Sequence, residues 1–388
     1  MSEWKEYKLG EIASKITSGG TPKSSEASFY DGDIPWLNTK EINFNRIVKT
    51  ERCITEEGLN NSSAKWIPKD SVIIAMYGAT AAKVAYSLID LTTNQACCNL
   101  TIDKAIADSK FVYYYIQSSY EELLNLACGA AQQNLSLGVI ADFPILLPSI
   151  QEQKRIASIL SSLDDKIDLL NRENVTLEAM AEALFRQWFI EEAKEDWEEV
   201  DVATYAEHYK ESVNPQKQAT TQFVHYSIPA YDDGKKPTME MGENIQSNKY
   251  VISQNCILFS KLNPHKDKRV WLILDDVAAN AICSTEFQVV KPIEKDYLYF
   301  LYGWLTNKEN YEEIASGVGG TSSSHQRIDP KSIFSFPCPH MEKDIINKYN
   351  KIVEPLFYKQ ENNRLQIKML TEQRDTLLPK LMSNEITI

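Results

Sequence analysis

The hydrophobic pattern between Pro148 and Phe189 predicts one long helix. Apolar residues recur there at alternating spacings of four and three, which is the heptad pattern of a helix that packs against another helix. No Gly or Pro interrupts the stretch after Pro148. The apolar positions that define this first seam are Ile156, Leu160, Leu163, Ile167, Leu170, Leu177 and Leu184, with Asn174, Ala181 and Trp188 completing the spacing.

A second seam follows 193 residues later, near the C-terminal end of the sequence. Its apolar members are Tyr349, Val353, Leu356, Ile367, Leu370, Leu377 and Leu381, with Gln360, Asn363 and Arg374 at the remaining positions. An apolar stripe of this length needs a partner, and two such helices in one chain can bury each other. If a two-fold axis relates the two copies, the helices run antiparallel.

Two features of the seams leave alternatives open. Asn174, Gln360, Asn363 and Arg374 either fix the register of the helix pair or face solvent because the apolar stripe drifts. Pro355 predicts that the second helix kinks there or begins after it, because proline cannot donate the backbone hydrogen bond of a helix interior.

The same offset of 193 residues relates the two segments that precede the helices. It connects Trp4 to Trp197 and Phe143 to Phe336, so we interpret the chain as a tandem duplication. The predicted fold class is α+β, with two tandem globular domains related by a pseudo-two-fold axis and separated by an antiparallel pair of long helices. The predicted boundaries are 1–147 and 196–338 for the globular domains, and 148–195 and 339–388 for the helices.

Each globular block shows strand-like apolar runs and one aromatic amphipathic helix. The strands are predicted at 72–77, 85–89 and 96–102 in the first block, and at 256–262, 271–274 and 287–290 in the second. The helices are predicted at 111–127 and 297–315. A polar loop with glycine follows each helix, at 129–138 and at 317–330, and such loops often carry binding function.

Composition and charge exclude several classes of protein. A hydrophobic content of 43% and an aromatic content of 10% are typical of a folded globular protein. A net charge of −13 argues against a non-specific nucleic-acid coat, so any DNA contact must use local patches or a partner's charges. With no apolar N-terminal signal and no membrane-spanning stretch, we expect a soluble, cytoplasmic protein that does not bind a membrane.

The residues that catalysis or metal binding would need are not arranged for either. The seven cysteines form no C-x-x-C pair, and the five histidines show no metal-binding spacing, so free thiols and no metal site are expected. Phosphate-binding, dinucleotide-binding, methyltransferase and serine-hydrolase motifs are missing. We therefore expect a chain that catalyses no reaction alone and binds no cofactor.

Several motifs together resemble those of type I restriction-modification specificity subunits. They are the opening W-K-x-Y-x-L-G-E-I with Ser18-Gly19-Gly20-Thr21-Pro22, the central LPSIQEQKRIASILSSLDDKID, and the distal Leu377–Ile386 segment. The second half departs from the pattern: Ser212-Val213-Asn214-Pro215 replaces the glycine-rich SGGTP, and His340–Asp344 replaces Q-E-Q.

The resemblance implies a non-catalytic subunit that reads a bipartite double-stranded DNA site with its two globular domains. The helices would hold the domains apart and bind two methyltransferase subunits, which use S-adenosylmethionine to methylate adenine. A motor-nuclease subunit using ATP and Mg²⁺ would cleave unmodified DNA. Alternatives are a system in which one fused partner carries both activities, an enzyme acting alone, and a coiled-coil scaffold that binds no DNA.

Candidate DNA-contacting residues are those whose side chains can donate to or accept from base edges and phosphates in the polar turns. In the first block they are Thr21, Lys23, Asn38, Lys40, Tyr77, Thr80, Lys83, Gln132, Gln133 and Asn134. In the second they are Lys235, Lys236, Lys261, Lys266, Lys268, Arg269, His325, Gln326 and Arg327. An acidic flank of the first helix (Asp164, Asp165, Asp168 and Glu173) is expected to remain free for the methyltransferase.

Overall fold

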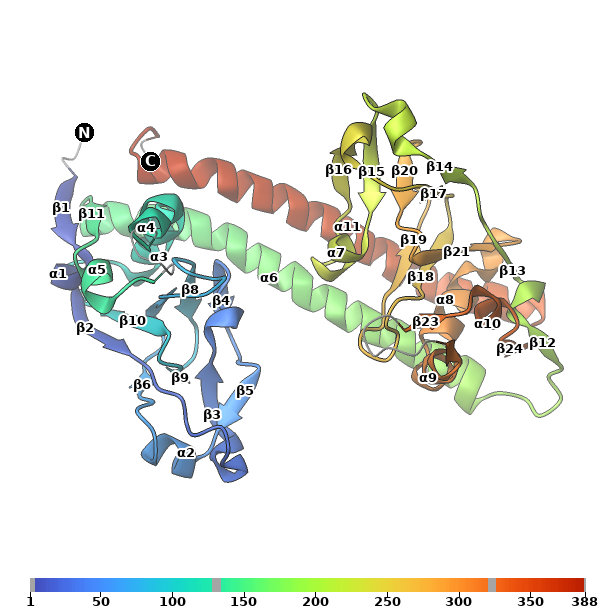
Figure 1. Cartoon of the computed structure of the whole chain (residues 1–388), viewed down its shortest axis with the longest axis horizontal. Coiled ribbons are helices and arrows are strands. Elements are labelled where there is room, and N and C mark those ends of the chain that lie inside the picture. Colours follow the sequence, from blue (N-terminus) through green and yellow to red (C-terminus); the bar gives the residue numbers. More distant parts are fainter. Residues whose placement is uncertain (1–3, 128–133, 320–325, 387–388) are drawn as a thin grey trace. The chain divides into compact units, whose positions relative to one another are not determined.

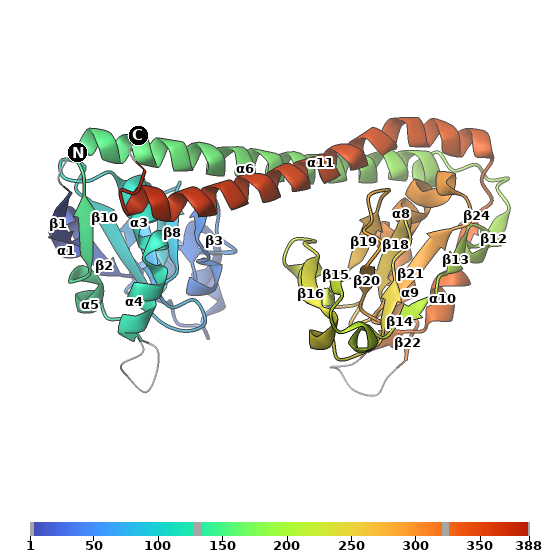
Figure 2. The same cartoon turned by 90° about the horizontal axis from the view of Figure 1, so that it is seen from above.

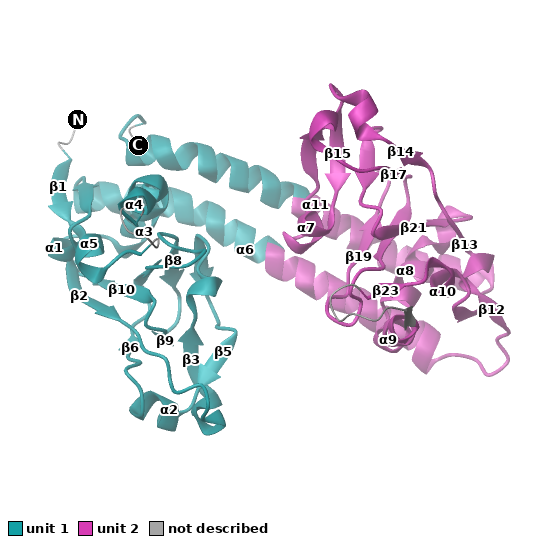
Figure 3. Cartoon of the chain, viewed as in Figure 1, with its two compact units in different colours: residues 1–170, 365–388 teal, residues 171–364 magenta. Residues whose placement is uncertain are grey.

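The computed structural model of the chain describes residues 4–127, 134–319 and 326–386 (Figure 1). The chain divides into two compact units, Met1–Leu170 with Leu365–Ile388, and Asn171–Arg364 (Figure 3). Each unit therefore contains one globular block and a part of both long helices.

The first unit is built on a five-stranded sheet and a second, four-stranded sheet. The sheet orders are β2-β10-β7-β8-β4 and β5-β3-β9-β6, and β1 pairs with β11. The strands are β1 (Lys5–Lys8), β2 (Ala13–Ser18), β3 (Tyr30–Leu37), β4 (Asn45–Ile47), β5 (Arg52–Ile54), β6 (Trp66–Ile67), β7 (Val72–Ala75), β8 (Val84–Ser87), β9 (Leu91–Thr93), β10 (Cys97–Ile102) and β11 (Pro144–Leu147). The short helices are α1 (Leu9–Ile12), α2 (Glu56–Asn60), α3 (Ser109–Ser118), α4 (Tyr120–Ala127) and α5 (Leu137–Ala141).

The second unit repeats the central part of this arrangement. Its sheets are β13-β21-β18-β19 and β14-β17-β20-β15-β16, with the pairs β12-β24 and β22-β23. The strands are β12 (Glu199–Asp201), β13 (Ala206–His208), β14 (Ser212–Val213), β15 (Gln222–Tyr226), β16 (Thr238–Met241), β17 (Lys249–Val251), β18 (Cys256–Ser260), β19 (Val270–Ile273), β20 (Ala281–Cys283), β21 (Phe287–Pro292), β22 (Val318–Gly319), β23 (Arg327–Ile328) and β24 (Pro337–Pro339). The short helices are α7 (Ile228–Asp232), α8 (Leu298–Thr306), α9 (Lys308–Ser316) and α10 (Pro330–Phe334).

The strands predicted from the apolar runs are neighbours in the sheets β2-β10-β7-β8-β4 and β13-β21-β18-β19. β10, β7 and β8 pair antiparallel in the first unit, as β21, β18 and β19 do in the second. Val72 to Ala75 and Cys256 to Ser260 are wholly buried, as expected of strands covered on both faces. The equal order of these strands agrees with a duplicated sequence.

Each aromatic helix predicted as one segment is two helices in the structure, so that prediction is wrong in detail. In the first unit α3 ends at Ser118, and Ser119 leaves the helical backbone conformation before α4 begins. In the second unit Asn307 separates α8 from α9, because its side chain accepts a hydrogen bond from the Asn310 amide and caps the second helix.

The two long helices, α6 (Ile150–Arg186) and α11 (Lys343–Met382), lie side by side within each unit (Figures 1 and 2). In the first unit Ile156 and Leu160 share a core with Leu378 and Leu381. In the second, Phe185 packs near Tyr349, with ring centroids 6.4 Å apart. Early residues of one helix meet late residues of the other, so the pairing is antiparallel in both units.

Pro355 lies inside α11, which runs unbroken from Lys343 to Met382, so a helix that begins after this proline is ruled out. Pro355 is exposed. The carbonyl of the preceding turn, which loses its usual amide donor at a proline, can therefore be hydrated by water.

The polar seam residues face the partner helix and not solvent. Asn363 is fully buried and Gln360 nearly so. The side-chain amide of Gln360 donates to the Asn174 carbonyl at 3.3 Å. Arg374 Nη1 donates to Asp164 Oδ1 at 2.9 Å within the first unit. This geometry favours the register-fixing alternative.

Candidate nucleic-acid interface

In the first unit, the turn between β7 and β8 gathers segments that are far apart in the sequence. The Met76 amide donates to the Ala96 carbonyl at 2.8 Å, and the Leu135 amide donates to the Met76 carbonyl at 2.7 Å. A single β-bridge pairs Tyr77 with Asn134. The end of this turn therefore lies against both the loop that precedes β10 and the loop that precedes α5.

Several predicted residues meet around this turn. Thr80 Oγ1 donates to the Thr39 carbonyl at 2.9 Å, which places the turn beside Asn38 and Lys40. Lys83 Nζ donates to Asn43 Oδ1 at 2.7 Å. Thr21 hydrogen-bonds Gln95, one residue before Ala96. The structure thus brings together Thr21, Asn38, Lys40, Tyr77, Thr80, Lys83 and Asn134, most of them exposed or half-buried.

The second unit builds the same junction from different side chains. The Lys261 amide donates to the Glu286 carbonyl at 2.9 Å, and the Ile328 amide donates to the Lys261 carbonyl at 3.0 Å. A β-bridge pairs Leu262 with Arg327. Lys261, Gln326 and Arg327 therefore lie together at the position that Met76, Tyr77 and Asn134 define in the first unit. We name these two places the turn junctions.

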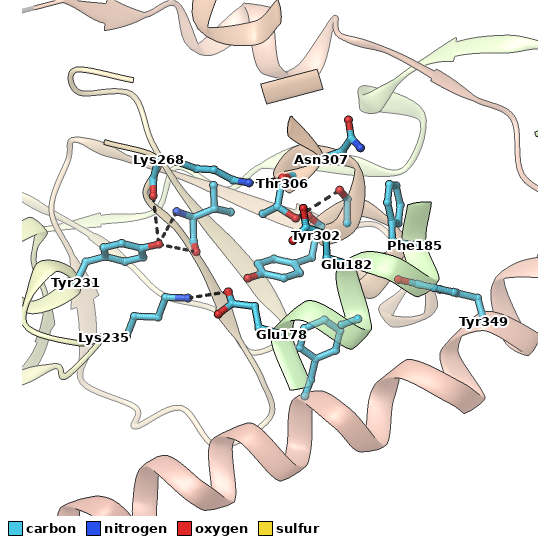
Figure 4. A pocket seen from close by; sticks show the side chains of 14 residues that line it. Glu178, Glu182, Phe185, Tyr231, Lys235, Lys268, Tyr302, Thr306, Asn307 and Tyr349 are labelled. Atoms are coloured by element: carbon cyan, nitrogen blue, oxygen red, sulfur yellow. Dashed lines mark hydrogen bonds and ion pairs between the residues drawn. The ribbon is translucent and has the colours of Figure 1, made fainter. Parts of the chain in front are cut away.

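Other predicted residues of the second unit lie against α6 instead. Lys235 and Lys268 line a cavity of about 210 Å³ together with Glu178, Tyr302 and Phe185 (Figure 4). Lys235 Nζ is 3.9 Å from a Glu178 carboxylate oxygen, and the Lys268 ammonium donates to the Thr306 carbonyl. Burial lowers the pKa of both lysines. Both ammonium groups therefore already have a partner within the second unit.

The remaining predicted residues are either paired or peripheral. Arg269 makes two hydrogen bonds to Asp232, at 2.7 and 2.9 Å, and is mostly buried. Lys23 pairs with Glu26 in the same segment at 3.1 Å. Lys236 and Lys266 are exposed. Gln132, Gln133 and His325 lie outside the described residues.

The sequence missed three residues of the turn junctions: Gln95, Asn43 and Glu286. Each is a short-loop residue whose role depends on a partner from elsewhere in the chain, so no local pattern identifies it. Glu286 makes two hydrogen bonds to the Arg327 guanidinium, at 2.7 and 3.0 Å.

The acidic flank of α6 is not free, so that expectation is wrong. Asp165 and Asp168 bind Arg46 of β4 at 2.6 and 2.5 Å. Asp164 is buried and accepts from Tyr114 at 2.6 Å as well as from Arg374. Although burial lowers the pKa of Arg46, its hydrogen bonds to the two aspartates raise it above its ordinary value. In the second unit, Glu173 pairs with Lys359 at 3.4 Å. These acids hold each unit together.

The apolar seam residues are buried or half-buried along both helices. Ile156, Leu160, Leu170 and Val353 are buried, while Leu163, Ile167, Leu177, Leu184, Leu356, Ile367, Leu370 and Leu377 are half-buried. On both helices the seams are thus the side turned away from solvent.

Within the described part of the chain, no group of acids, histidines and cysteines is placed to hold a metal ion. Six cysteines are free thiols there, five of them buried, and burial raises the pKa of Cys97, Cys98, Cys256, Cys283 and Cys338. Cys128 lies outside the described residues. Among the described residues, no helix is both apolar and long enough to cross a membrane.

Comparison with known proteins connects this architecture to one family. Residues 1–179 match the family described as the type I restriction modification DNA specificity domain. The chain is 27% identical, over 426 aligned positions, to the type I restriction enzyme MjaIX specificity subunit of Methanocaldococcus jannaschii, covering all of this chain and 94% of that protein. The chain is thus similar to type I specificity subunits, through the matched domain in residues 1–179 and through a relative that aligns along the whole chain.

Two further matches agree with this assignment. The EcoR124I/EcoR124II specificity subunit of Escherichia coli is 33% identical over 168 residues, covering 42% of this chain and 41% of that protein. A crystal structure of the type I S subunit from M. genitalium superposes with a TM-score of 0.63 at 18% identity, covering 98% of this chain and 96% of that chain. The chain therefore shares its fold with a solved S subunit.

Proposed function

We propose that this specificity subunit reads a bipartite DNA sequence, with one recognition domain for each half. Residues 1–147 would form one domain and residues 196–338 the other. The observation that carries the proposal is the pair of turn junctions, which have the same backbone hydrogen bonds and different side chains. A repeated scaffold with changed polar groups suits two half-sites of different sequence.

The charge of the chain is consistent with DNA-recognition domains that depend on partner subunits to bind the phosphates. The chain carries a net charge of −13, and Arg269, Arg327 and Lys40 are paired with acids. Phosphate neutralisation by this chain alone would be modest. We infer that two methyltransferase subunits supply much of it and that a motor-nuclease subunit joins them. S-adenosylmethionine, ATP and Mg²⁺ would belong to those partners, and this chain would catalyse no step.

Since the DNA lies in the cytoplasm, we expect the protein to work there. The exposed faces of α6 and α11 are the surfaces we assign to the methyltransferase. Leu365 and Met369, one turn apart on α11, are more than half exposed at 53% and 61%, and apolar residues left open on a helix suit a partner contact.

The test is a domain exchange in the assembled methyltransferase complex. Residues 196–338 are replaced by the second domain of another specificity subunit, and the methylated sequence is determined. Only one half of the sequence should change. The reciprocal exchange of residues 1–147 is the matched control and should change only the other half, whereas a change in both halves from either exchange contradicts the proposal.

A further inference from the structure

Asn134 and Arg327 hold equivalent positions in the two units. They are 193 residues apart, which is the offset of the duplication. The residue after each donates its amide to the turn between the central strands, Leu135 to Met76 and Ile328 to Lys261. The next residue after that caps a short helix in each case, Ser136 for α5 and Asp329 for α10.

The neighbours across the junction are equivalent as well. Ala96 accepts the hydrogen bond from the Met76 amide, and Glu286 accepts the one from the Lys261 amide. The first unit therefore carries an amide side chain beside an alanine, where the second carries an arginine beside a glutamate. The scaffold is the same and the hydrogen-bonding chemistry differs.

The Arg327–Glu286 pair leaves one edge of the guanidinium unused by the carboxylate. Glu286 accepts from Nε at 3.0 Å and from Nη2 at 2.7 Å. This side-on pairing takes one of the two Nη2 hydrogens. Nη1 and the second Nη2 hydrogen remain as a fork at the end of the side chain, which is 47% exposed. Glu286 is the more buried partner, at 24%, so it fixes the direction of the fork.

We propose that Arg327 reads a guanine in the second half-site and that Asn134 reads an adenine at the equivalent place in the first. A guanidinium fork matches the two acceptors of a guanine edge, and a carboxamide matches the donor and acceptor of an adenine edge. Glu286 is a positioning residue that touches Arg327 and not the base. This assignment rests on the proposed function and adds which side chains distinguish the two halves.

The experiment uses the full chain assembled with its methyltransferase subunits. The complex selects duplexes from a randomised DNA library, and the bound sequences are read for the wild type and for Arg327→Ala, Arg327→Gln, Glu286→Gln and Asn134→Ala. Lys291→Ala is the matched control, because Lys291 is also a partly exposed cation paired with a glutamate, at 3.6 Å, but lies on β21 and not on either long helix. Co-purification with the methyltransferase shows that each variant is folded.

Arg327→Ala should relax one guanine position in one half and weaken binding of the wild-type sequence by about 10- to 100-fold. Arg327→Gln should move the preference at that position toward adenine, a gain that misfolding cannot produce. Glu286→Gln should weaken the guanine preference without changing its identity. Asn134→Ala should relax an adenine position in the other half.

Three results would overturn the assignment: no position relaxed by Arg327→Ala, a relaxed position that is an A·T pair, or the same relaxation from Lys291→Ala. An Asn134→Ala complex with an unchanged first half overturns the adenine reading. A wild-type complex that selects no sequence at all would refute the proposed function, and this assignment with it.

Discussion

Asn363 on α11 donates a hydrogen bond from Nδ2 to Oδ1 of Asn174 on α6, at 3.0 Å. The same amide also reaches Glu173 at 2.9 Å. Asn363 is fully buried, and its own side-chain oxygen has no hydrogen-bond partner within the described residues. A polar pair of this kind within an apolar seam costs stability and specifies which residues face each other.

Replacing only Asn363 with leucine should destabilise the protein. Asn174 and Glu173 would lose a donor, and we expect the free energy of unfolding to fall by about 1–2 kcal/mol. The double variant Asn174→Leu with Asn363→Leu should recover most of this loss, because both polar partners are then removed. Urea unfolding of the two single variants and the double variant measures the coupling, and strictly additive losses would show that the pair is not coupled.

Arg46 should be a principal anchor between the first block and α6. Its side chain is only 7% exposed and binds two aspartates of the helix. Arg46→Met should lower the free energy of unfolding by about 2 kcal/mol, since charged hydrogen bonds at a buried guanidinium are lost. The control is Lys8→Met, which removes an exposed pair with Asp142 and should cost much less, because solvent screens that pair. Equal losses in urea unfolding would contradict the anchor role.

The free energy of unfolding should fall in acid as the carboxylate of Asp275 becomes protonated. Hydrogen bonds from Tyr358, Asn255 and Lys295 lower the pKa of this carboxyl from 3.8 to about 2 in the folded protein. Its contribution is therefore complete above pH 4 and is lost as the pH falls toward 2.

Urea midpoints of the wild type and Asp275→Asn, measured from pH 6 to pH 2, test this. The two proteins should differ most above pH 4 and converge in acid. Asp276→Asn removes the exposed neighbouring carboxylate and serves as the control. A difference that persists unchanged at pH 2 would rule out the proposed linkage.

We predict that helix length sets the gap between the two half-sites. α6 and α11 each carry residues of both units without a break. Inserting one heptad in each helix adds about 10 Å, which is roughly three base pairs. The methylated sequence should keep both halves and gain about three unread positions. An unchanged gap would mean that the helices only hold the units together.

The seams were predictable because they depend on local spacing. Leu160, Leu170 and Val353 fall at heptad positions, and each is buried as a seam residue should be. The central strands were predictable for a similar reason, since Val72 to Ala75 is an uninterrupted apolar run. The fold class and its duplication followed from these local signals and their common offset.

Distant pairing was not predictable. The local sequence does not show that the acids of α6 are paired, because Arg46, which binds them, lies about 120 residues earlier in the chain. Glu286 gained its role only through Arg327, which lies 41 residues later. Pro355 is tolerated in α11 because it is exposed, and the exposure of one helical position depends on what packs around it.

The second sheets were missed because their strands lack an apolar pattern. β3 contains Gly32 and Pro35, and β16 is a short edge strand with exposed Met239. Residues of this type are typical of loops in a single sequence. Pairing with other strands fixes them: β3 pairs with β5 and β9, and β15 pairs with β16 and β20.

The central claim is that this one chain selects a DNA sequence in two unlike halves. The most direct measurement is to map methylated adenines across the genome of a cell that carries this protein and its methyltransferase partner, with a cell lacking only this chain as control. The account predicts methylation at one bipartite sequence, with two different halves and an unread gap, that vanishes in the control. Methylation that persists without this chain, or a single uninterrupted recognition sequence, would contradict it.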